Sequence, residues 1–382
     1  MRHSEELDRV IVAKVGSSTL VGPDGSLDYA YLSSLVDQLV ELKGMGFRPV
    51  LVSSGAVAAG MERLGLAERP SDIPALQACA SAGQAALTEV YAERLAAHGC
   101  PCGQVLLTRR DVVDRRGYLN ARNTLDYLLE LGAVPVVNEN DTVAAYEFVF
   151  GDNDMLGAIV STLVGAERYV ILSDIDGMFT ADPSTHPDAE LIEHVDRIDA
   201  DLVACAGGAG SSVGTGGMAA KLRAARALLA AGIPMTICHG RRPRSLVDAV
   251  LGRGRRTEFG SPGAPREQAR KLWIGIANRA AGTVGVDAGC ADAIRSQGAS
   301  LLPVGVRSVS GTFDEGDVVS VVGPDGALVA RGVTRYCSAD LAKSRGLPLD
   351  VVARFLPDKA DVPAIHRDEL LVFYPFHREV RP

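Results

Sequence analysis

The stretch VIVAKVGSS, at residues 10–18, joins an apolar run to a small polar turn. Such a continuous apolar run is typical of a strand covered on both faces. The glycine and serines after it are the residues that a strand-to-helix turn needs. Lys14 lies near the end of the run, where burying a charge costs free energy unless the ammonium meets an anion. The stretch therefore predicts either a buried lysine that binds an anion or a lysine on an edge strand.

The same alternation of apolar runs and helical patterns continues to about residue 240. It predicts a mostly parallel sheet, and such sheets bind ligands beyond the carboxyl ends of their strands. The strand candidates are RVIVAKVG, RPVLVSSG, GQVLLT, AVPVVNEN, RYVILSD and IPMTICHG. The helix candidates are Tyr29–Met45, Ile73–Ala97, Leu119–Leu131, Met155–Val164 and Met218–Ala231.

Small and polar residues gather at those carboxyl ends. KVGSS follows the first strand, SSGA the second, NEND the fourth and SDIDG the fifth. Turns rich in Gly and Ser let backbone N–H groups approach an anion, and the N-terminus of the next helix assists. Because these turns meet at one edge of a parallel sheet, we expect a ligand site there.

Two further motifs could carry chemistry. FGDND precedes an apolar helix, and its residues Asp152, Asn153 and Asp154 either cap that helix or bind a cation or a donor-rich ligand. GSSVGTGGMAAK, Gly210–Lys221, is either a surface loop with a solvated lysine or a backbone that folds around phosphates. Two lysines with metal-binding carboxylates are what phosphoryl transfer requires. In that interpretation the aspartates organise the lysines and a metal, and Asn153 donates to an anionic substrate.

The composition limits the class of protein. The chain has 382 residues, enough for two or three domains. A net charge of -8 and a pI near 5.5 argue against nucleic acid or an anionic membrane as partner and favour a small molecule. The sequence lacks a signal peptide and any run of ~18 apolar residues, so we expect a cytoplasmic protein. Its cysteines are odd in number and scattered, which predicts reduced thiols.

The character of the sequence changes after about residue 253. An Arg-, Gly- and Pro-rich stretch predicts a linker, and the short Val- and Gly-rich runs beyond it predict a small β-rich module with a turn at PDG. The module contains as many basic as acidic residues, which argues against a nucleic-acid-binding face. The expected divisions are a first domain at 1–255, a linker at 256–274, a β-rich domain at 275–357 and a tail at 358–382 that packs back or frays.

Taken in order, the motifs resemble those of the glutamate 5-kinase family. They are KVGSS, VSSGAVAAG, LLTRRD, LNARNTL, PVVNENDTV, FGDND, SDIDGMFTADP, GTGGMAAK and SLLPVGVRSVSG, over roughly residues 8 to 357. The resemblance implies an amino-acid kinase domain, which is an αβα sandwich with a mostly parallel sheet, followed by a PUA-like domain. It implies phosphorylation of the γ-carboxylate of L-glutamate with ATP and Mg²⁺ in proline biosynthesis. It also implies feedback inhibition by proline and a homo-oligomer, either a dimer or a tetramer.

The resemblance also assigns roles to residues. The lysines Lys14 and Lys221 would stabilise the transferring phosphoryl group, and Asp154 would orient them. The residues that contact glutamate would be Ser54, Asp141 and Asn153. The residue types themselves, and not the resemblance, make Asp152 and Asp154 the candidate metal ligands. The residues that bind ATP would be Lys14, Ser173, Asp174, Thr215, Gly216, Gly217, Met218, Ala219, Ala220 and Lys221. The attacking γ-carboxylate is already ionised at neutral pH, so no general base is needed.

Other interpretations stay open from the sequence. A different amino-acid kinase could act on N-acetylglutamate, aspartate or a nucleoside monophosphate, although NENDTV, FGDND and the C-terminal module favour glutamate. An RNA-binding protein could use the C-terminal module for recognition. A proline sensor without activity would lack a phosphate-binding lysine or the acidic cluster, and both are present.

Overall fold

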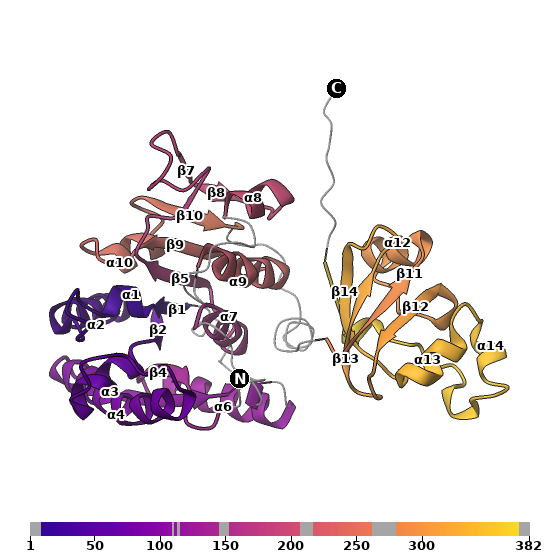
Figure 1. The fold of residues 1–382 in the computed structure, drawn as a ribbon, viewed down its shortest axis with the longest axis horizontal. Helices are drawn as coiled ribbons and strands as arrows, with labels where there is room; N and C mark the ends of the chain where they lie inside the picture. Colours follow the sequence, from indigo (N-terminus) through magenta and orange to yellow (C-terminus); the bar gives the residue numbers. More distant parts are fainter. Residues whose placement is uncertain are drawn as a thin grey trace. The chain divides into compact units, whose positions relative to one another are not determined.

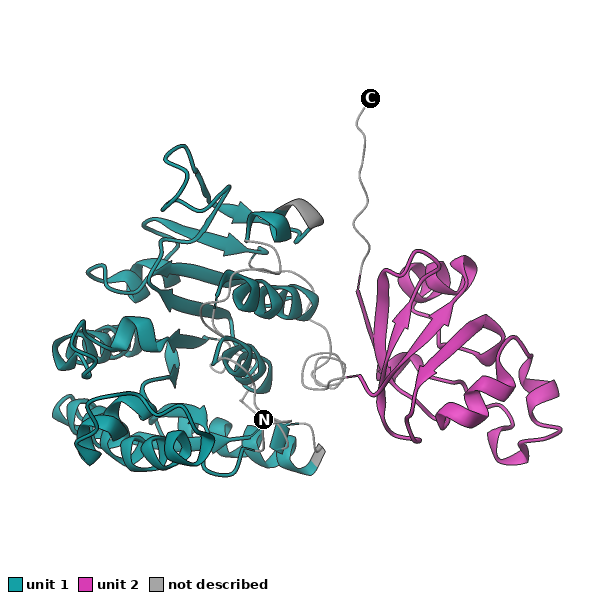
Figure 2. Ribbon diagram, in the orientation of Figure 1, with its two compact units in different colours: residues 1–266 teal, residues 267–382 magenta. Residues whose placement is uncertain are grey.

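The chain forms two compact units, Met1–Arg266 and Glu267–Pro382, each with a sheet of its own (Figure 2). The structure is a computed structural model, and it describes residues 9–108, 111–112, 115–144, 153–206, 217–261 and 280–373. The site residues that the sequence predicts all belong to the first unit.

The first unit is built around an eight-stranded, mostly parallel sheet. Its strands are β1 (Val10–Val15), β2 (Arg48–Ser53), β3 (Cys102–Leu107), β4 (Val134–Glu139), β5 (Arg168–Ser173), β8 (His194–Val195), β9 (Met235–His239) and β10 (Arg256–Phe259). Their order is β3-β4-β2-β1-β5-β9-β10-β8, and β10 runs antiparallel to β9. Every strand predicted from an apolar run is confirmed. The short strands β6 (Met178–Phe179) and β7 (Leu191–Ile192) pair separately.

Helices cover both faces of this sheet, as Figure 1 shows. They are α1 (Ser17–Leu20), α2 (Tyr29–Gly44), α3 (Ala56–Leu64), α4 (Ile73–Ala97), α6 (Arg115–Glu130), α7 (Asn153–Leu163), α8 (Ala200–Cys205), α9 (Met218–Ala231) and α10 (Ser245–Val250). Helices α2, α4 and α10 lie on one face, and α6, α7 and α9 on the other. The predicted αβα sandwich is confirmed.

The ends of the predicted helices follow from local chemistry. Helix α4 begins after Asp72, whose side chain accepts a hydrogen bond from the Ala75 N–H. Helix α9 ends at Gly232, which adopts the left-handed conformation at φ 66° that closes a helix at low cost. Both helices have the bounds expected from the sequence.

The position of β1 decides between the two interpretations of Lys14. Strand β1 lies between β2 and β5, and Lys14 is in register with Val52 and Ile171. The edge-strand alternative is therefore wrong. The chain runs from β1 toward β2 on one side and from β5 toward β9 on the other, so the carboxyl edge between β1 and β5 is the kind of switch point where open α/β sheets bind ligands.

Strand β10 corrects the expected start of the linker. It occupies Arg256–Phe259, the first residues of the range expected to be a linker, and pairs with β9. Thr257 and Phe259 are fully buried, so these residues belong to the core of the first unit. The arginines and glycines around this strand mask its short alternating pattern in the sequence.

The second unit has a five-stranded sheet in the order β12-β11-β13-β14-β15. Its strands are β11 (Gly282–Val286), β12 (Val306–Gly311), β13 (Val318–Val322), β14 (Leu328–Val333) and β15 (Leu370–Val372). Its helical segments are α12 (Ala288–Gln297), η2 (Pro303–Gly305), α13 (Ser338–Ser344), α14 (Leu349–Val352), η3 (Pro357–Lys359) and η4 (Arg367–Glu369). The PDG turn joins β13 to β14, which are antiparallel as predicted.

Part of the expected tail belongs to this second core. Strand β15 pairs with β14, and Ile365 forms a bridge with Leu301. Ile365, Leu370 and Leu371 are each at most 1% exposed. The segment through Phe373 therefore packs back and completes the sheet, whereas residues 374–382 lie outside the described residues.

Two further features concern membrane-spanning segments and cysteines. Within the part of the chain that the structure describes, no helix is both long and apolar enough to cross a membrane. All seven cysteines are free, as the odd number and scattered positions predict.

Candidate active site

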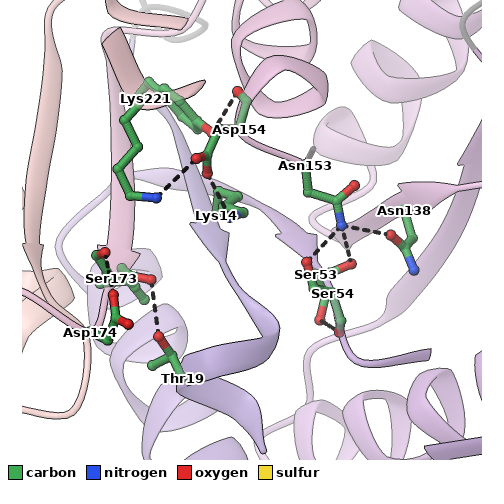
Figure 3. A network of polar contacts seen from close by, with 12 residues as sticks. Lys14, Thr19, Ser53, Ser54, Asn138, Asn153, Asp154, Ser173, Asp174 and Lys221 are labelled. Carbon is green, nitrogen blue, oxygen red and sulfur yellow. Dashed lines mark hydrogen bonds and ion pairs between the residues drawn. The ribbon is translucent and has the colours of Figure 1, made fainter. Parts of the chain in front are cut away.

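One buried carboxylate joins the two lysines that the sequence singles out (Figure 3). Lys14 Nζ lies 2.5 Å from Asp154 Oδ1, and Lys221 Nζ lies 3.0 Å from Asp154 Oδ2. The Asp154 side chain is 0% exposed, and each lysine side chain is 8% exposed. Strand β1 and the first turns of α7 and α9 therefore converge on one point. The alternative of a solvated lysine at residue 221 is wrong.

The charges in this cluster keep the carboxylate ionised. Burial by itself raises the pKa of Asp154, but the charges of Lys14 and Lys221, and their hydrogen bonds, lower that pKa below its ordinary value. Two ammonium groups around one carboxylate leave an excess of one positive charge. That charge lies at the N-termini of α7 and α9, which also favour anions. The cluster can therefore bind an anion such as a phosphate.

Packing against β5 fixes the backbone of Asp154. The Tyr169 hydroxyl donates a hydrogen bond to the Asp154 carbonyl at 3.0 Å. Gly157, one turn along α7, permits this contact because a Cβ there would lie 2.2 Å from the tyrosine hydroxyl oxygen. The carboxylate is therefore held by the fold as well as by its two ion pairs.

The preceding residue, Asn153, faces a neutral group of side chains (Figure 3). Asn153 Nδ2 donates to Ser54 Oγ at 2.8 Å, to Asn138 Oδ1 at 3.0 Å and to the Ser53 carbonyl at 3.3 Å. An amide has only two N–H groups, and here they bond to the protein. In this structure the polar atom that Asn153 leaves for a ligand is therefore Oδ1, an acceptor, which differs from the donor expected from the sequence.

Asn138 is a site residue that the sequence reasoning missed. It lies at the end of β4, is 3% exposed, and accepts a hydrogen bond from its own neighbour, the Glu139 N–H, at 2.9 Å. The motif NEND stands out in the sequence, but only Asp141 within it was assigned a role. An asparagine at the end of an apolar strand is a signal of its own, because a buried amide needs specific partners.

Asp141 lies just beyond β4 and is half-buried. Burial raises its pKa. It lines a small cavity of about 20 Å³ together with Gln84, Glu139 and Thr142. Gln84, which lines the same cavity as Asp141, accepts a hydrogen bond from the Asn138 side chain. Asp141 therefore lies near the pair formed by Asn138 and Gln84.

The expected nucleotide residues lie at the neighbouring strand ends. Ser173 ends β5 and donates to Asp174 Oδ1 at 3.0 Å. Thr19, in α1, donates to the Leu172 carbonyl at 3.3 Å and links the turn after β1 to β5. The residues expected to line the phosphates at α9 are its N-cap Gly217 and the first-turn residues Met218, Ala219, Ala220 and Lys221. Thr215 and Gly216 lie outside the described residues.

The described residues do not fit a metal site. Within those ranges, no three His, Cys, Asp or Glu side chains are placed to hold an ion. Both oxygens of Asp154 face ammonium groups, so Asp154 does not fit the expected role of metal ligand. Asp152, the other candidate ligand, lies outside the described residues.

Comparison with protein families identifies the family of each part of the chain. Residues 9–239 match the amino acid kinase family, and residues 282–356 match the PUA domain. The chain belongs to the amino acid kinase family. Within that family, this kinase is 44% identical over 362 residues to "Glutamate 5-kinase" of Geobacter sp. (strain M21), covering 95% of this chain and 97% of that one.

Two other relatives of this kinase match to the same degree. "Glutamate 5-kinase" of Pseudomonas putida (strain GB-1) is 45% identical over 361 residues, covering 94% of this chain and 97% of that one. The protein of the same name from Moorella thermoacetica is 45% identical over 367 residues, covering 95% and 96%. A solved carbamate kinase from Giardia lamblia bound to AMP-PNP has 16% identity and a TM-score of 0.49 over 67% of this chain and 99% of that one, so the assignment rests on the sequence relatives.

Proposed function

We infer that this chain phosphorylates the γ-carboxylate of L-glutamate with ATP, giving L-glutamyl 5-phosphate, the first step of proline biosynthesis. The observation that carries this conclusion is the buried Lys14–Asp154–Lys221 cluster, beside a neutral hydrogen-bonding site, in a chain whose full-length relatives are named Glutamate 5-kinase. N-acetylglutamate kinase, aspartate kinase and RNA-binding activities have no comparable support.

The reaction needs charge stabilisation more than proton transfer. A γ-carboxylate oxygen of glutamate attacks the γ-phosphorus of ATP, a new P–O bond forms, and the P–O bond to ADP breaks. The attacking carboxylate is ionised at neutral pH, so no proton has to leave it. The transition state spreads negative charge over the moving phosphoryl group, and the ammonium groups of Lys14 and Lys221 are placed to neutralise it.

We propose that the two substrates share the carboxyl edge of the sheet. ATP phosphates would bind at Lys14 and the N-terminus of α9, with Ser173 and Asp174 nearer the nucleotide. Glutamate would bind at Ser54, Asp141 and Asn153. Two strand pairings support this division. Strands β1 and β5, which carry Lys14 and Ser173, are neighbours. Strands β2 and β4, which end just before Ser54 and Asp141, are neighbours as well.

Further properties are proposed on narrower grounds. Mg²⁺ would arrive with the nucleotide, because the described residues offer it no ligand set. The free cysteines support a cytoplasmic location. Feedback inhibition by proline and assembly into a homo-oligomer rest on the family resemblance alone. We propose a kinase domain that extends through β10 and a PUA-like domain that includes β15, on the evidence of their strand pairings.

The proposal is tested by trapping the acyl phosphate as a hydroxamate. Wild type, Lys221→Ala and, as control, Lys343→Ala would each receive ATP with L-glutamate, N-acetyl-L-glutamate or L-aspartate. We expect signal with glutamate alone, and a fall in kcat of about 10²- to 10³-fold in Lys221→Ala, the usual effect of removing one group that stabilises a transition-state charge. Lys343, in the second unit, has a side chain that is 69% exposed, and its replacement should leave kcat unchanged. Signal only with another acid would overturn the substrate, and no signal at all would overturn the reaction.

A further inference from the structure

A chain of three side-chain amides runs from the interior of α4 to the first residue of α7. Asn153 Nδ2 donates to Asn138 Oδ1 at 3.0 Å, and Asn138 Nδ2 donates to Gln84 Oε1 at 2.8 Å. Gln84 is 8% exposed and Asn138 is 3% exposed. Buried amides are costly unless they are hydrogen-bonded, and this chain pairs each of them with the next.

Backbone groups fix the direction of this chain at two points. The Glu139 N–H donates to Asn138 Oδ1 at 2.9 Å, so Asn138 must turn its NH₂ group toward Gln84. The Ser53 carbonyl accepts from Asn153 Nδ2 at 3.3 Å, so Asn153 must turn its NH₂ group inward. A flip of either amide would set oxygen against oxygen or leave a backbone group unpaired.

The far end of the chain is closed by a hydroxyl. Gln84 Nε2 donates to Thr88 Oγ1 at 3.2 Å, and the Thr88 hydroxyl donates in turn to the Gln84 carbonyl at 2.8 Å. Thr88 Oγ1 also accepts from Gln104 Nε2 at 2.8 Å. With its NH₂ group engaged in this way, Gln84 presents its oxygen to Asn138.

Close packing of α4 on α3 holds Gln84 in place. A Cβ on Gly83 would lie 1.8 Å from the Ala56 carbonyl oxygen and 2.2 Å from the Gly60 nitrogen. Only glycine lets the two helix backbones approach this closely. Because α3 begins directly after the Ser54 turn, the position of Gln84 is tied to that turn.

We propose that Gln84 is a positioning residue of the glutamate site, which fixes the amide of Asn138 and, through it, that of Asn153. This inference rests on the proposed function. Its consequence is that Asn153 presents an oxygen, and the α-ammonium is the only group of ionised L-glutamate that donates hydrogen bonds. Gln84 thereby sets which end of the substrate the site accepts, and it does so through Asn138 and Asn153.

The test replaces the acceptor oxygen of Gln84 while keeping the length of the side chain. In Gln84→Met, we expect the KM for glutamate to rise about tenfold, the effect of one lost hydrogen bond to a buried amide. The KM for ATP and kcat should stay within about twofold, because the lysine cluster is untouched.

Gln104→Met is the matched control. Gln104 bonds to the same Thr88 hydroxyl but is exposed and lies outside the amide chain. Its replacement should leave the KM for glutamate unchanged. An equal rise in Gln84→Met and Gln104→Met would assign Gln84 to packing and overturn the proposal.

A double-mutant cycle with Asn138→Ala isolates the route of the effect. If Gln84 acts through Asn138, then Gln84→Met changes the KM for glutamate by less than about twofold in the Asn138→Ala background. Additive effects would overturn the proposal. If Gln84→Met does not fold, Gln84→Leu takes its place in both comparisons. Absence of glutamate-dependent activity in wild type would overturn the proposed function, whereas an active wild type with an unchanged KM in Gln84→Met would overturn only the role of Gln84.

Discussion

Two neighbouring residues at the start of α7 serve chemically opposite halves of the site. Asp154 faces two ammonium groups, and Asn153 faces a serine hydroxyl, a backbone carbonyl and another amide (Figure 3). The first half works by net charge, which acts over distance and in any direction. The second half works by hydrogen bonds, which require donors and acceptors to be correctly oriented. In the proposed function, one helix terminus thus combines charge stabilisation with orientation of the acceptor substrate.

The two halves also differ in what a substitution costs. Removing the buried carboxylate leaves two buried ammonium groups without their counter-charge, whereas removing one amide leaves a neutral group short of a hydrogen bond. The first loss is the larger by several kcal/mol on these grounds. The comparison can therefore be tested by the size of the effects as well as by the kinetic constant that changes.

The largest effect is expected for Asp154→Ala. We expect kcat to fall by at least about 10²-fold, because neither lysine is then held for the phosphoryl group. The free energy of unfolding should fall by about 3–5 kcal/mol, as expected when one partner of a buried ion pair is lost. Steady-state kinetics and urea denaturation measure the two changes.

The control for Asp154→Ala is an exposed ion pair. Arg63 Nη2 and Glu89 Oε2 lie 3.0 Å apart, and both side chains are 60% exposed. Glu89→Ala should lower the free energy of unfolding by less than about 1 kcal/mol and leave kcat unchanged. If Asp154→Ala lowered the free energy of unfolding by no more than Glu89→Ala does, Asp154 would not act as the counter-charge of two buried ammonium groups.

A smaller effect, in a different constant, is expected for Asn153→Ala. The KM for glutamate should rise about 10- to 100-fold while the KM for ATP stays within about threefold, because only the neutral half is altered. Asn123→Ala, at an exposed position on α6, is the control and should change neither constant. Equal increases in both KM values would mean that the two halves do not bind separate substrates.

The smallest effect is a difference in pH dependence between the two carboxylates. Burial raises the pKa of Asp141, so this residue gains a proton at higher pH than an ordinary aspartate, and kcat/KM for glutamate should fall as the pH drops through that pKa. Asp141→Asn should have a lower value at neutral pH and a flatter profile on the acid side. Parallel profiles for wild type and Asp141→Asn would show that Asp141 does not bind substrate as a carboxylate.

The two carboxylates should also affect stability with opposite signs. A raised pKa in the folded state means that Asp141 contributes less stability as the pH rises through it. Burial raises the pKa of Asp154, but Lys14 and Lys221 lower it by more, so that it lies below the ordinary aspartate value. The contribution of Asp154 to stability is therefore present above the ordinary aspartate pKa and is lost as the pH falls below it. Urea denaturation of Asp141→Asn and Asp154→Asn across the acidic range measures both slopes.

Local patterns were enough to predict most of the secondary structure, the mostly parallel sheet and the residue types of the cationic half, and the family resemblance supplied the αβα class. Apolar runs and helical periods depend on near neighbours, so β1, α4 and α9 could be predicted from the sequence, and Lys14 and Lys221 were conspicuous where they stand in these patterns. The β10 strand and the β15 strand were missed, because each is short and defined by its pairing with a distant partner.

The arrangement of the site residues depends on tertiary contacts. The tertiary structure placed β1 in the interior of the sheet, brought Asp154 between two lysines from separate elements, and turned the Asn153 amide inward against the expectation that it donates to substrate. Gln84 and Asn138 gave no joint signal, because a hydrogen bond between residues far apart in the chain leaves no local period. The direction of an amide is set by its partners, and those partners exist only once the sheet and its helices have assembled.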